Sequence, residues 1–259
     1  MALFNDGPIN RTDELLQFDS SAMDTAALEG VDTGAQIANA QTAIGVEILT
    51  FLLDNEPADP LFGSATGGRR RRLGTSDVVV TAELKRWHAF QTLHGIYRDA
   101  LGHQSNDRYE WKFEEFGKLT RDAKWRCLGI GIGLAADPMA RAAAPQITMV
   151  AGGGSAGSLY FAAAFVNASG QEGAASSATE ATVQEGMQAR VTVNCVPENA
   201  RGWNVYAGIS PTSLMRQNST ALDIGAGWLQ PALIVAGDAP GEGQRPSFHA
   251  VQNQIVRRG

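Results

Sequence analysis

The chain changes character near Pro145, and this change constrains its fold more than any other feature. Before Pro145, apolar residues recur at helical spacing and the segment carries most of the charge. After it, the chain has no lysine and reads as short strands. The 259 residues are enough for two modest domains, each with its own core. We therefore predict a multi-domain α plus β protein: a helical domain at 1–144, a β-domain at 145–236 and an extended tail at 237–259.

Four helices, with apolar residues spaced by three or four, are predicted before Pro145. They cover Thr12–Glu29, Asp32–Leu53, Thr81–Gly102 and Asp107–Cys127. Asp32 and Thr81 are suited to capping the second and third helices, and Asp107 with Glu110 resembles a capping box for the fourth. A short turn makes the last two helices an antiparallel hairpin. The long stretch Asn55–Asp77, with two prolines and four glycines, is predicted as a loop.

After Pro145, short strands separated by turn residues are predicted. They cover Ile147–Val150, Leu159–Asn167, Thr179–Val183, Ala189–Cys195, Gly202–Gly208 and Leu214–Asn218. Turns such as GGGSAG and PENARG lie between them. Short strands punctuated at this spacing predict an all-β sandwich.

No recognisable catalytic or metal-binding pattern occurs in the sequence. The two cysteines, Cys127 and Cys195, make neither a disulfide framework nor a metal-ligand cluster. The histidines lack His-x-x-x-His or Glu-x-x-His spacing, and we expect them to be surface or half-buried side chains. No serine lies in a Gly-x-Ser-x-Gly elbow. We therefore predict a protein that is not an enzyme and uses no metal or cofactor.

Nothing in the sequence predicts contact with a membrane. The N-terminal stretch MALFNDGPINRTDE lacks a basic region followed by an apolar core, so no signal peptide is predicted. The longest apolar run, Cys127–Ala136, is too short and glycine-rich to span a bilayer. The thiols are expected to be reduced, as in the cytosol.

Charge is unevenly distributed along the helical half. Residues 1–56 contain ten acids against one base, Arg11, whereas residues 69–126 contain thirteen bases against eight acids. Segments of opposite sign can pair within one fold or between neighbouring copies in an oligomer. The sequence leaves both alternatives open.

The strongest local signal is a run of four arginines, Arg69, Arg70, Arg71 and Arg72, after Gly67-Gly68. Such a run can be a solvated charged loop. It can also contact phosphates through counterion release, or grip a partner's carboxylates. Contact with DNA is expected only if many copies bring their arginines together.

The helical half resembles the head-to-tail connector (adaptor) proteins of tailed bacteriophages. Three stretches carry the resemblance: Asp13–Glu29 followed by VDTGAQIANAQTAIGVEI, LKRWHAFQTL from Leu84 leading to IYRDA, and NDRY from Asn106 with Trp111-Lys-Phe. The order of a helical pair, a long loop and a helical hairpin is similar throughout residues 11–136.

The β-half resembles fibronectin type III or immunoglobulin-like domains appended to phage structural proteins. The residues that carry this are SLYFAAAFVNASG from Ser158 and ARGWNVYAGIS from Ala200. The combination departs from a simple adaptor, which would end near Ala144.

The resemblance implies a ring of about twelve copies under the portal vertex of a capsid, assembled in the host cytoplasm and extending the DNA channel toward the tail. Its partners would be the portal protein, a downstream tail or neck protein, neighbouring copies and DNA passing non-specifically through the channel. The Arg69–Arg72 run would face the lumen or the portal. The polar tail would order on docking, through Phe248, Val251, Ile255, Val256, Arg257 and Arg258.

Two other functions remain open from the sequence. The β-half is alternatively a module that binds a host surface polysaccharide, in which case exposed aromatic side chains are expected on one sheet. The chain is alternatively another neck or tail component. An enzyme such as a glycan hydrolase would require a carboxylate pair in a cleft.

Overall fold

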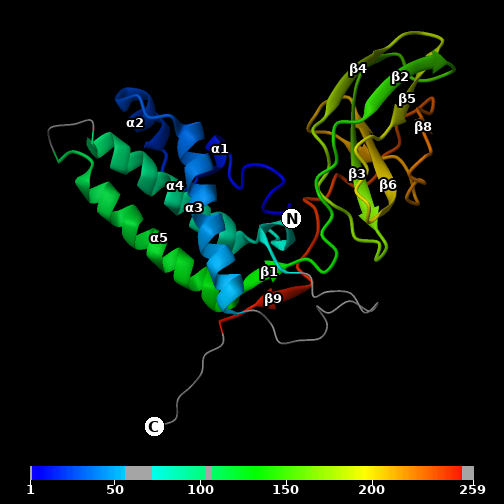
Figure 1. Ribbon diagram of the computed structural model, residues 1–259. Helices are drawn as coiled ribbons and strands as arrows, with labels where there is room; N and C mark the ends of the chain where they lie inside the picture. The colour runs from blue at the N-terminus through cyan, green and yellow to red at the C-terminus, as the bar shows by residue number, and fades with distance from the viewer. Residues whose placement is uncertain (1, 56–71, 103–106, 253–259) are drawn as a thin grey trace. The chain divides into compact units, whose positions relative to one another are not determined.

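The computed structural model describes residues 2–55, 72–102 and 107–252. They divide into two compact units, which we call the helical unit and the β unit. The helical unit is Gly7–Ala136 together with Pro246–Gly259, and the β unit is Met1–Asp6 together with Asp137–Arg245. Helices precede a region of antiparallel sheets along the chain (Figure 1), which confirms the predicted α plus β class.

The helical unit is built around one central helix. Its helices are α1 Thr12–Leu15, α2 Ala22–Glu29, α3 Thr33–Asp54, the 3-10 turn η2 Thr75–Asp77, α4 Ala82–Gly102 and α5 Glu110–Ile130. Helix α4 contacts α1, α2, α3 and, most extensively, α5, which runs beside it in the opposite direction (Figure 1). Trp87, Leu93, Ile96 and Tyr97 of α4 are all fully buried. Burial of these large side chains makes α4 the core helix of the unit.

The single helix predicted over Thr12–Glu29 is wrong, because the chain leaves the helix after Leu15 and enters a new one at Ala22. The side chain of Asp19 accepts hydrogen bonds from the backbone N–H and the hydroxyl of Ser21, both at 2.9 Å. Such a local side-chain bond competes with helical backbone bonds and ends the helix. Gly30, with φ of 68°, ends α2 as predicted.

The predicted caps of the two long helices are confirmed. The Asp32 carboxylate accepts from the backbone N–H of Ala35 at 3.0 Å, and the Thr81 hydroxyl accepts from that of Leu84 at 3.3 Å. The capping box predicted at Asp107 is wrong. Helix α5 begins at Glu110 with Tyr109 as its N-cap, and no side chain caps it.

A two-stranded ribbon joins distant parts of the helical unit. Strand β1, Ile132–Leu134, pairs antiparallel with β9, Phe248–Ala250, and Leu134 also bridges Val78 before α4. The sequence analysis predicts no strand at β1 and places β9 in an extended tail, so the pairing of these two segments is not foreseen. The ribbon attaches residues 246–252 to the end of α5.

The β unit contains two antiparallel sheets. Their strands are β2 Gln146–Ala151, β3 Gly157–Asn167, β4 Thr179–Val183, β5 Met187–Thr192, β6 Ala200–Gly208, β7 Met215–Arg216 and β8 Trp228–Leu229. One sheet has the order β2-β5-β8 and the other β4-β3-β6-β7. Phe161, Trp203 and Val205 of the larger sheet and Val191 and Trp228 of the smaller one belong to one buried cluster. The two sheets therefore share a core.

The larger sheet is also covered on its other face. Ala162 and Ala164 of β3 and Tyr206 of β6 form a second buried cluster, against which Ala175 and Ala178 pack. The Tyr206 hydroxyl donates to the Glu172 carboxylate. Burial on both faces accounts for the alanine run in β3, because small side chains allow the segment around residues 172–178 to approach the sheet.

Candidate functional site

The structure describes only some of the residues predicted to make contacts. Arg72 is exposed, whereas Arg69, Arg70 and Arg71 lie outside the described residues. In the predicted docking tail, Phe248 is half-buried in β9 and Val251 is 49% exposed. Ile255, Val256, Arg257 and Arg258 lie outside the described residues.

Helix α3 exposes an uncharged stripe along its whole length. Its inner face buries Ile37, Ile44 and Ile48. The exposed side chains at helical spacing on the other face are Ala35, Ala38, Asn39, Thr42, Val46, Leu49, Thr50 and Leu53. Only Glu47 and Asp54 in this helix of 22 residues are charged. The outer face is therefore uncharged and exposes three large apolar side chains, Val46, Leu49 and Leu53; such an exposed face is suited to contact with a partner. The low charge of residues 33–54 is the feature of the sequence that indicates this exposed stripe.

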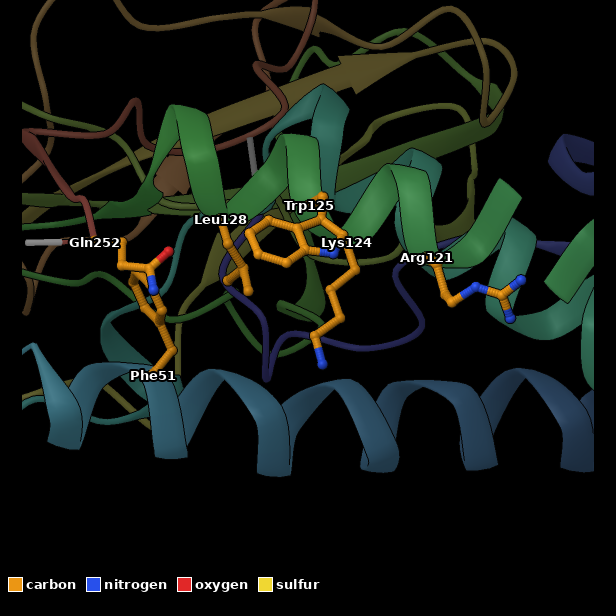
Figure 2. A pocket seen from close by; sticks show the side chains of 6 residues that line it. All are labelled: Phe51, Arg121, Lys124, Trp125, Leu128 and Gln252. Atoms are coloured by element: carbon orange, nitrogen blue, oxygen red, sulfur yellow. The ribbon is translucent and has the colours of Figure 1, made fainter. Parts of the chain in front are cut away.

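A hollow of about 390 Å³ lies between α3 and α5. We call it the α3–α5 hollow; it is lined by Phe51, Arg121, Lys124, Trp125, Leu128 and Gln252. Figure 2 shows the Trp125 ring projecting from α5 over the α3–α5 hollow and the Phe51 side chain projecting toward it from α3. The Trp125 side chain is 70% exposed. Large exposed aromatic side chains beside a hollow are typical of surfaces that bind a partner.

The charged side chains at this hollow are mostly cationic. Lys124 forms an ion pair of 2.8 Å with Glu47 of α3. Arg121 is exposed, points away from Trp125 in Figure 2, and has no ion pair among the described residues. The hollow therefore combines an apolar lining with a free guanidinium group, which suits an apolar group flanked by a carboxylate.

A second surface lies at the other end of α5. A hollow of about 310 Å³ is lined by Ser21, Asp24, Thr25, Leu28, Arg108, Tyr109, Trp111 and Lys112. Leu28 of α2 is 65% exposed and Trp111 of α5 is 60% exposed. Asp24, one helical turn before Leu28, has no ion pair among the described residues. This surface therefore combines exposed apolar side chains with a free carboxylate, and the cationic Arg108 and Lys112 also line it.

Beneath this second surface, a polar cluster ties three helices together. The Lys112 ammonium group of α5 donates to Asp19 and to Ser21, both at 2.5 Å, and to the Tyr97 hydroxyl of α4 at 2.9 Å. Burial acts against charge on Asp19, but the hydrogen bonds from Lys112, Tyr97 and Ser21 outweigh it and lower the pKa of this carboxyl. The pKa of Lys112 is raised, because its bonds to Asp19 and Tyr97 outweigh its own burial. A lysine held protonated is a structural cation and is unsuited to act as a general base.

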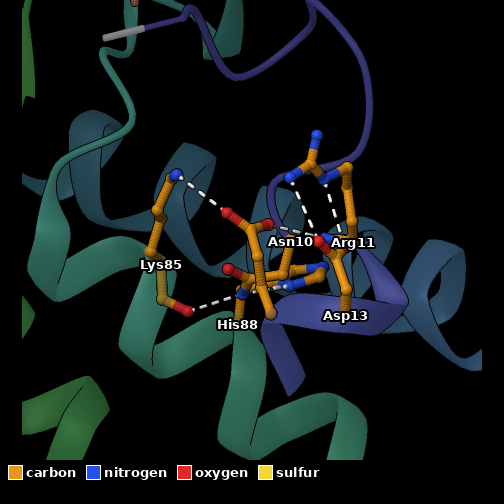
Figure 3. A network of polar contacts seen from close by, with 6 residues as sticks. Asn10, Arg11, Asp13, Lys85 and His88 are labelled. Atoms are coloured by element: carbon orange, nitrogen blue, oxygen red, sulfur yellow. Dashed lines mark hydrogen bonds and ion pairs between the residues drawn. The ribbon is translucent and has the colours of Figure 1, made fainter. Parts of the chain in front are cut away.

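A buried histidine attaches the N-terminal segment of the unit to α3 and α4, as Figure 3 shows in part. His88 Nε2 lies 3.1 Å from the Ile37 carbonyl and Nδ1 lies 3.0 Å from the Asn10 amide nitrogen, which also donates to the Lys85 carbonyl at 2.7 Å. Burial lowers the pKa of His88 to about 4. The prediction of a surface or half-buried side chain is wrong for His88, which is fully buried. Its partners lie too far away in sequence to be foreseen.

The sequence left open whether the acidic and basic segments pair within one fold or between copies. Ion pairs within the helical unit answer part of this question. Three bases of α4 and α5 pair with acids that come earlier in the chain: Lys85 with Glu14, Lys112 with Asp19 and Lys124 with Glu47. The opposite charges therefore pair within the fold at these positions. Asp24 and Arg121 do not take part in such pairs within the described part of the chain.

The β unit presents little aromatic surface. Phe161, Phe165, Trp203, Tyr206 and Trp228 are all buried. Tyr160 is the remaining aromatic side chain between residues 137 and 245, and it is half-buried beside Glu180 of the next strand. Sugar-binding surfaces of the kind considered above need exposed aromatic faces, so this arrangement does not favour a polysaccharide-binding module.

The described residues contain no cluster of three or more His, Cys, Asp or Glu side chains placed to hold a metal ion. No helix in this part of the chain is both long and apolar enough to cross a bilayer.

No family model and no curated protein matches the chain.

Proposed function

We propose that this protein is a structural component of a tailed bacteriophage virion. In this proposal it is an adaptor that forms a ring of about twelve copies, joins the portal vertex of the capsid to the tail and extends the DNA channel. The observation that carries the proposal is the exposed uncharged stripe of α3. A helix of 22 residues with an uncharged outer face that exposes Val46, Leu49 and Leu53 is suited to packing against another protein on that side.

The two ends of α5 support the same proposal. Trp111 is 60% exposed and Trp125 is 70% exposed. Tryptophan is enriched among the residues that dominate binding energy at protein interfaces. Two such side chains on one helix are unusual for a unit with no partner. The helical unit therefore has several surfaces suited to neighbouring copies, the portal and the next tail component.

We further propose that the β unit is an immunoglobulin- or fibronectin type III-like domain carried on the neck. Its support is two antiparallel sheets, of three and four strands, that share one core. Seven strands in two sheets is the number in the constant type of immunoglobulin fold.

The adaptor proposal is tested by measuring mass with light scattering, for the protein alone, the portal protein of the same virus alone, and a mixture of the two. The expected result is a stable complex carrying about twelve copies per portal ring. A mixture whose components keep their separate masses at every ratio would contradict the proposal. The matching control is a mixture with an unrelated ring-shaped protein, which should not bind.

The arginine run is proposed to face the DNA channel or the portal. Replacing Arg69, Arg70, Arg71 and Arg72 with glutamine distinguishes the two. If the run contacts the portal, the variant binds the portal less tightly and with a weaker dependence on salt. If it faces the channel, portal binding is unchanged, while the assembled complex retains DNA less well as salt is raised. A variant identical to the natural chain in both measurements would contradict both placements.

A further inference from the structure

The helical unit carries two surfaces with a matching pattern, in which a charged side chain without an ion pair lies near a large exposed apolar one. These two charges, Asp24 and Arg121, are of opposite sign. On α2, the carboxylate of Asp24 lies four residues before the exposed Leu28. On α5, the guanidinium of Arg121 lies four residues before the exposed Trp125. Residues four apart in a helix lie on the same face. Each surface therefore presents a charged group one helical turn from a large exposed apolar side chain.

Both charged groups are without ion pairs in the described part of the chain, although other charges of the same helices are paired. Lys112 and Lys124 of α5, for example, bind Asp19 and Glu47. Asp24 and Arg121 thus remain available for an external partner. An acid on one surface and a base on the other are complementary charges.

The shapes of the two surfaces differ in a complementary way. The α3–α5 hollow, of about 390 Å³, has an apolar lining from Phe51, Trp125 and Leu128. At the other surface, Leu28 is 65% exposed, so most of its side chain projects into solvent. An exposed leucine that enters an apolar hollow removes apolar surface from water on both sides, which favours association.

The two surfaces are separated along α5. Trp111 borders the Asp24 surface and Trp125 borders the hollow. They are 14 residues apart on α5 (125 minus 111), which corresponds to roughly 21 Å along the helix. Two different surfaces at opposite ends of one element make a heterologous, head-to-tail contact, and such contacts generate rings when the rotation closes. Both surfaces belong to the helical unit, so the contact does not depend on the β unit.

We propose that Leu28 of one copy enters the α3–α5 hollow of the next copy, with Asp24 of the first copy paired to Arg121 of the second. The partner is therefore a second copy of this chain. This contact rests on the proposed ring and specifies which residues join neighbouring copies.

The contact is tested by reversing each charge and measuring self-association by sedimentation velocity over a range of concentrations. Asp24→Arg places two arginines together at every contact, and Arg121→Glu places two acids together. Each variant alone should associate at least about tenfold more weakly than the natural protein. Both positions are exposed, and surface substitutions usually change folding stability by at most about 0.5 kcal/mol. Thermal denaturation should therefore show that both variants are folded.

Mixing gives the sharper result. In an equal mixture of the Asp24→Arg and Arg121→Glu variants, alternating copies place arginine against glutamate at one contact and aspartate against arginine at the next. The mixture should therefore associate as the natural protein does, and so should a chain that carries both substitutions. Glu115→Arg and Lys118→Glu change exposed charges between the two surfaces. These control variants should associate normally.

Three results would overturn the contact: a natural protein that is monomeric at every concentration, single variants that associate normally, or a mixture that stays dissociated. The portal measurement separates this proposal from the proposed function. If the protein binds the portal but its self-association does not change with these charges, the adaptor proposal stands and the proposed contact between copies is rejected. Self-association that follows the charge pattern, without any portal binding, would retain the contact and reject the adaptor.

Discussion

At the scale of single residues, the surroundings of His88 fix its protonation state. The Ile37 carbonyl only accepts hydrogen bonds, so Nε2, 3.1 Å away, carries the hydrogen. Nδ1 then accepts from the Asn10 amide nitrogen at 3.0 Å. A second proton on the ring would leave two donors facing each other at Nδ1. The carbonyl bond and the charge of Glu14 favour protonation, but burial is the larger effect and lowers the pKa to about 4.

This burial predicts that His88 makes stability depend on pH. The pKa of the folded state, about 4, is below the ordinary value of 6.5, so the unfolded chain binds more protons between these values. The neutral His88 side chain therefore contributes fully to the free energy of unfolding above pH 6.5. This contribution, about 3 kcal/mol in all, is lost as the pH falls toward 4. His88→Gln should remove this part of the slope when the free energy of unfolding is measured in urea between pH 7 and pH 4. Identical slopes for the two proteins would contradict the prediction.

Two glycines at the end of α5 give a second prediction at this scale. Gly131 has φ of 106°, and a Cβ there would lie 2.9 Å from the Ala250 carbonyl oxygen of β9. Gly131→Ala should therefore lower stability by about 2 kcal/mol, through backbone strain and displacement of the ribbon. Gly129→Ala is the matched control, since a Cβ at this helical position meets nothing within 4 Å. It should leave stability unchanged or raise it by up to about 1 kcal/mol. Urea unfolding followed by far-ultraviolet circular dichroism compares them, and equal effects would refute the argument.

At the scale of elements, the break between α1 and α2 shows where helical spacing is an insufficient guide. The apolar positions of residues 12–29 fit one helix, yet Asp19 leaves the helical pattern to bond Ser21, Tyr97 and Lys112. Tyr97 and Lys112 are distant in sequence, so no local pattern predicts this outcome. The resulting ion pair is mostly buried, with 17% and 9% of the two side chains exposed.

Removing one member of this pair should cost much more than removing both. Asp19→Asn leaves the Lys112 ammonium group largely buried without its counter-charge, and we expect a loss of about 3 kcal/mol. The double variant Asp19→Leu with Lys112→Met leaves no buried charge and should be more stable than Asp19→Asn. Urea unfolding of the three proteins gives this comparison. If the single and double variants lose the same free energy, the pair is not the element that holds α2 against α4 and α5.

The contrast among elements shows what the sequence could predict. The caps at Asp32 and Thr81 depend on hydrogen bonds to backbone groups only three residues away. The residue types at these two positions were therefore sufficient to predict the caps. Strand β4 was predicted with its observed bounds, Thr179–Val183, because alternation along one strand is also local. Strands β1 and β9 contain three residues each and form by pairing with segments distant in sequence, with each other and, for β1, with Val78. The α3–α5 hollow likewise requires Phe51 and Trp125 to meet, which tertiary packing alone decides.

At the scale of the whole molecule, residues 137–245 of the β unit are an insertion in the chain of the helical unit. The helical unit resumes at Pro246 after the β unit ends at Arg245. The insertion points lie close together, because the Ala136 backbone N–H donates to the Ser247 hydroxyl at 3.2 Å and the Ser247 N–H donates to the Leu134 carbonyl at 2.8 Å. A short linker is therefore long enough to replace residues 137–245.

This chain order predicts opposite results for two truncations of similar helical content. A protein ending at Ala144 keeps every helix but loses β9. Strand β1 then keeps only its bridge to Val78, and Ile132 and Leu134, both buried in the full chain, lose the cover that β9 gives them. A protein in which a few glycine and serine residues replace residues 137–245 keeps the ribbon. Melting followed by circular dichroism at 222 nm should show the second protein unfolding near the temperature of the helical unit in the full chain. The first should unfold at a clearly lower temperature, because burial of each large apolar side chain contributes roughly 1.5–3 kcal/mol. Equal melting temperatures would mean that the helical unit is complete without residues 246–252, and that the β1–β9 ribbon does not stabilise it.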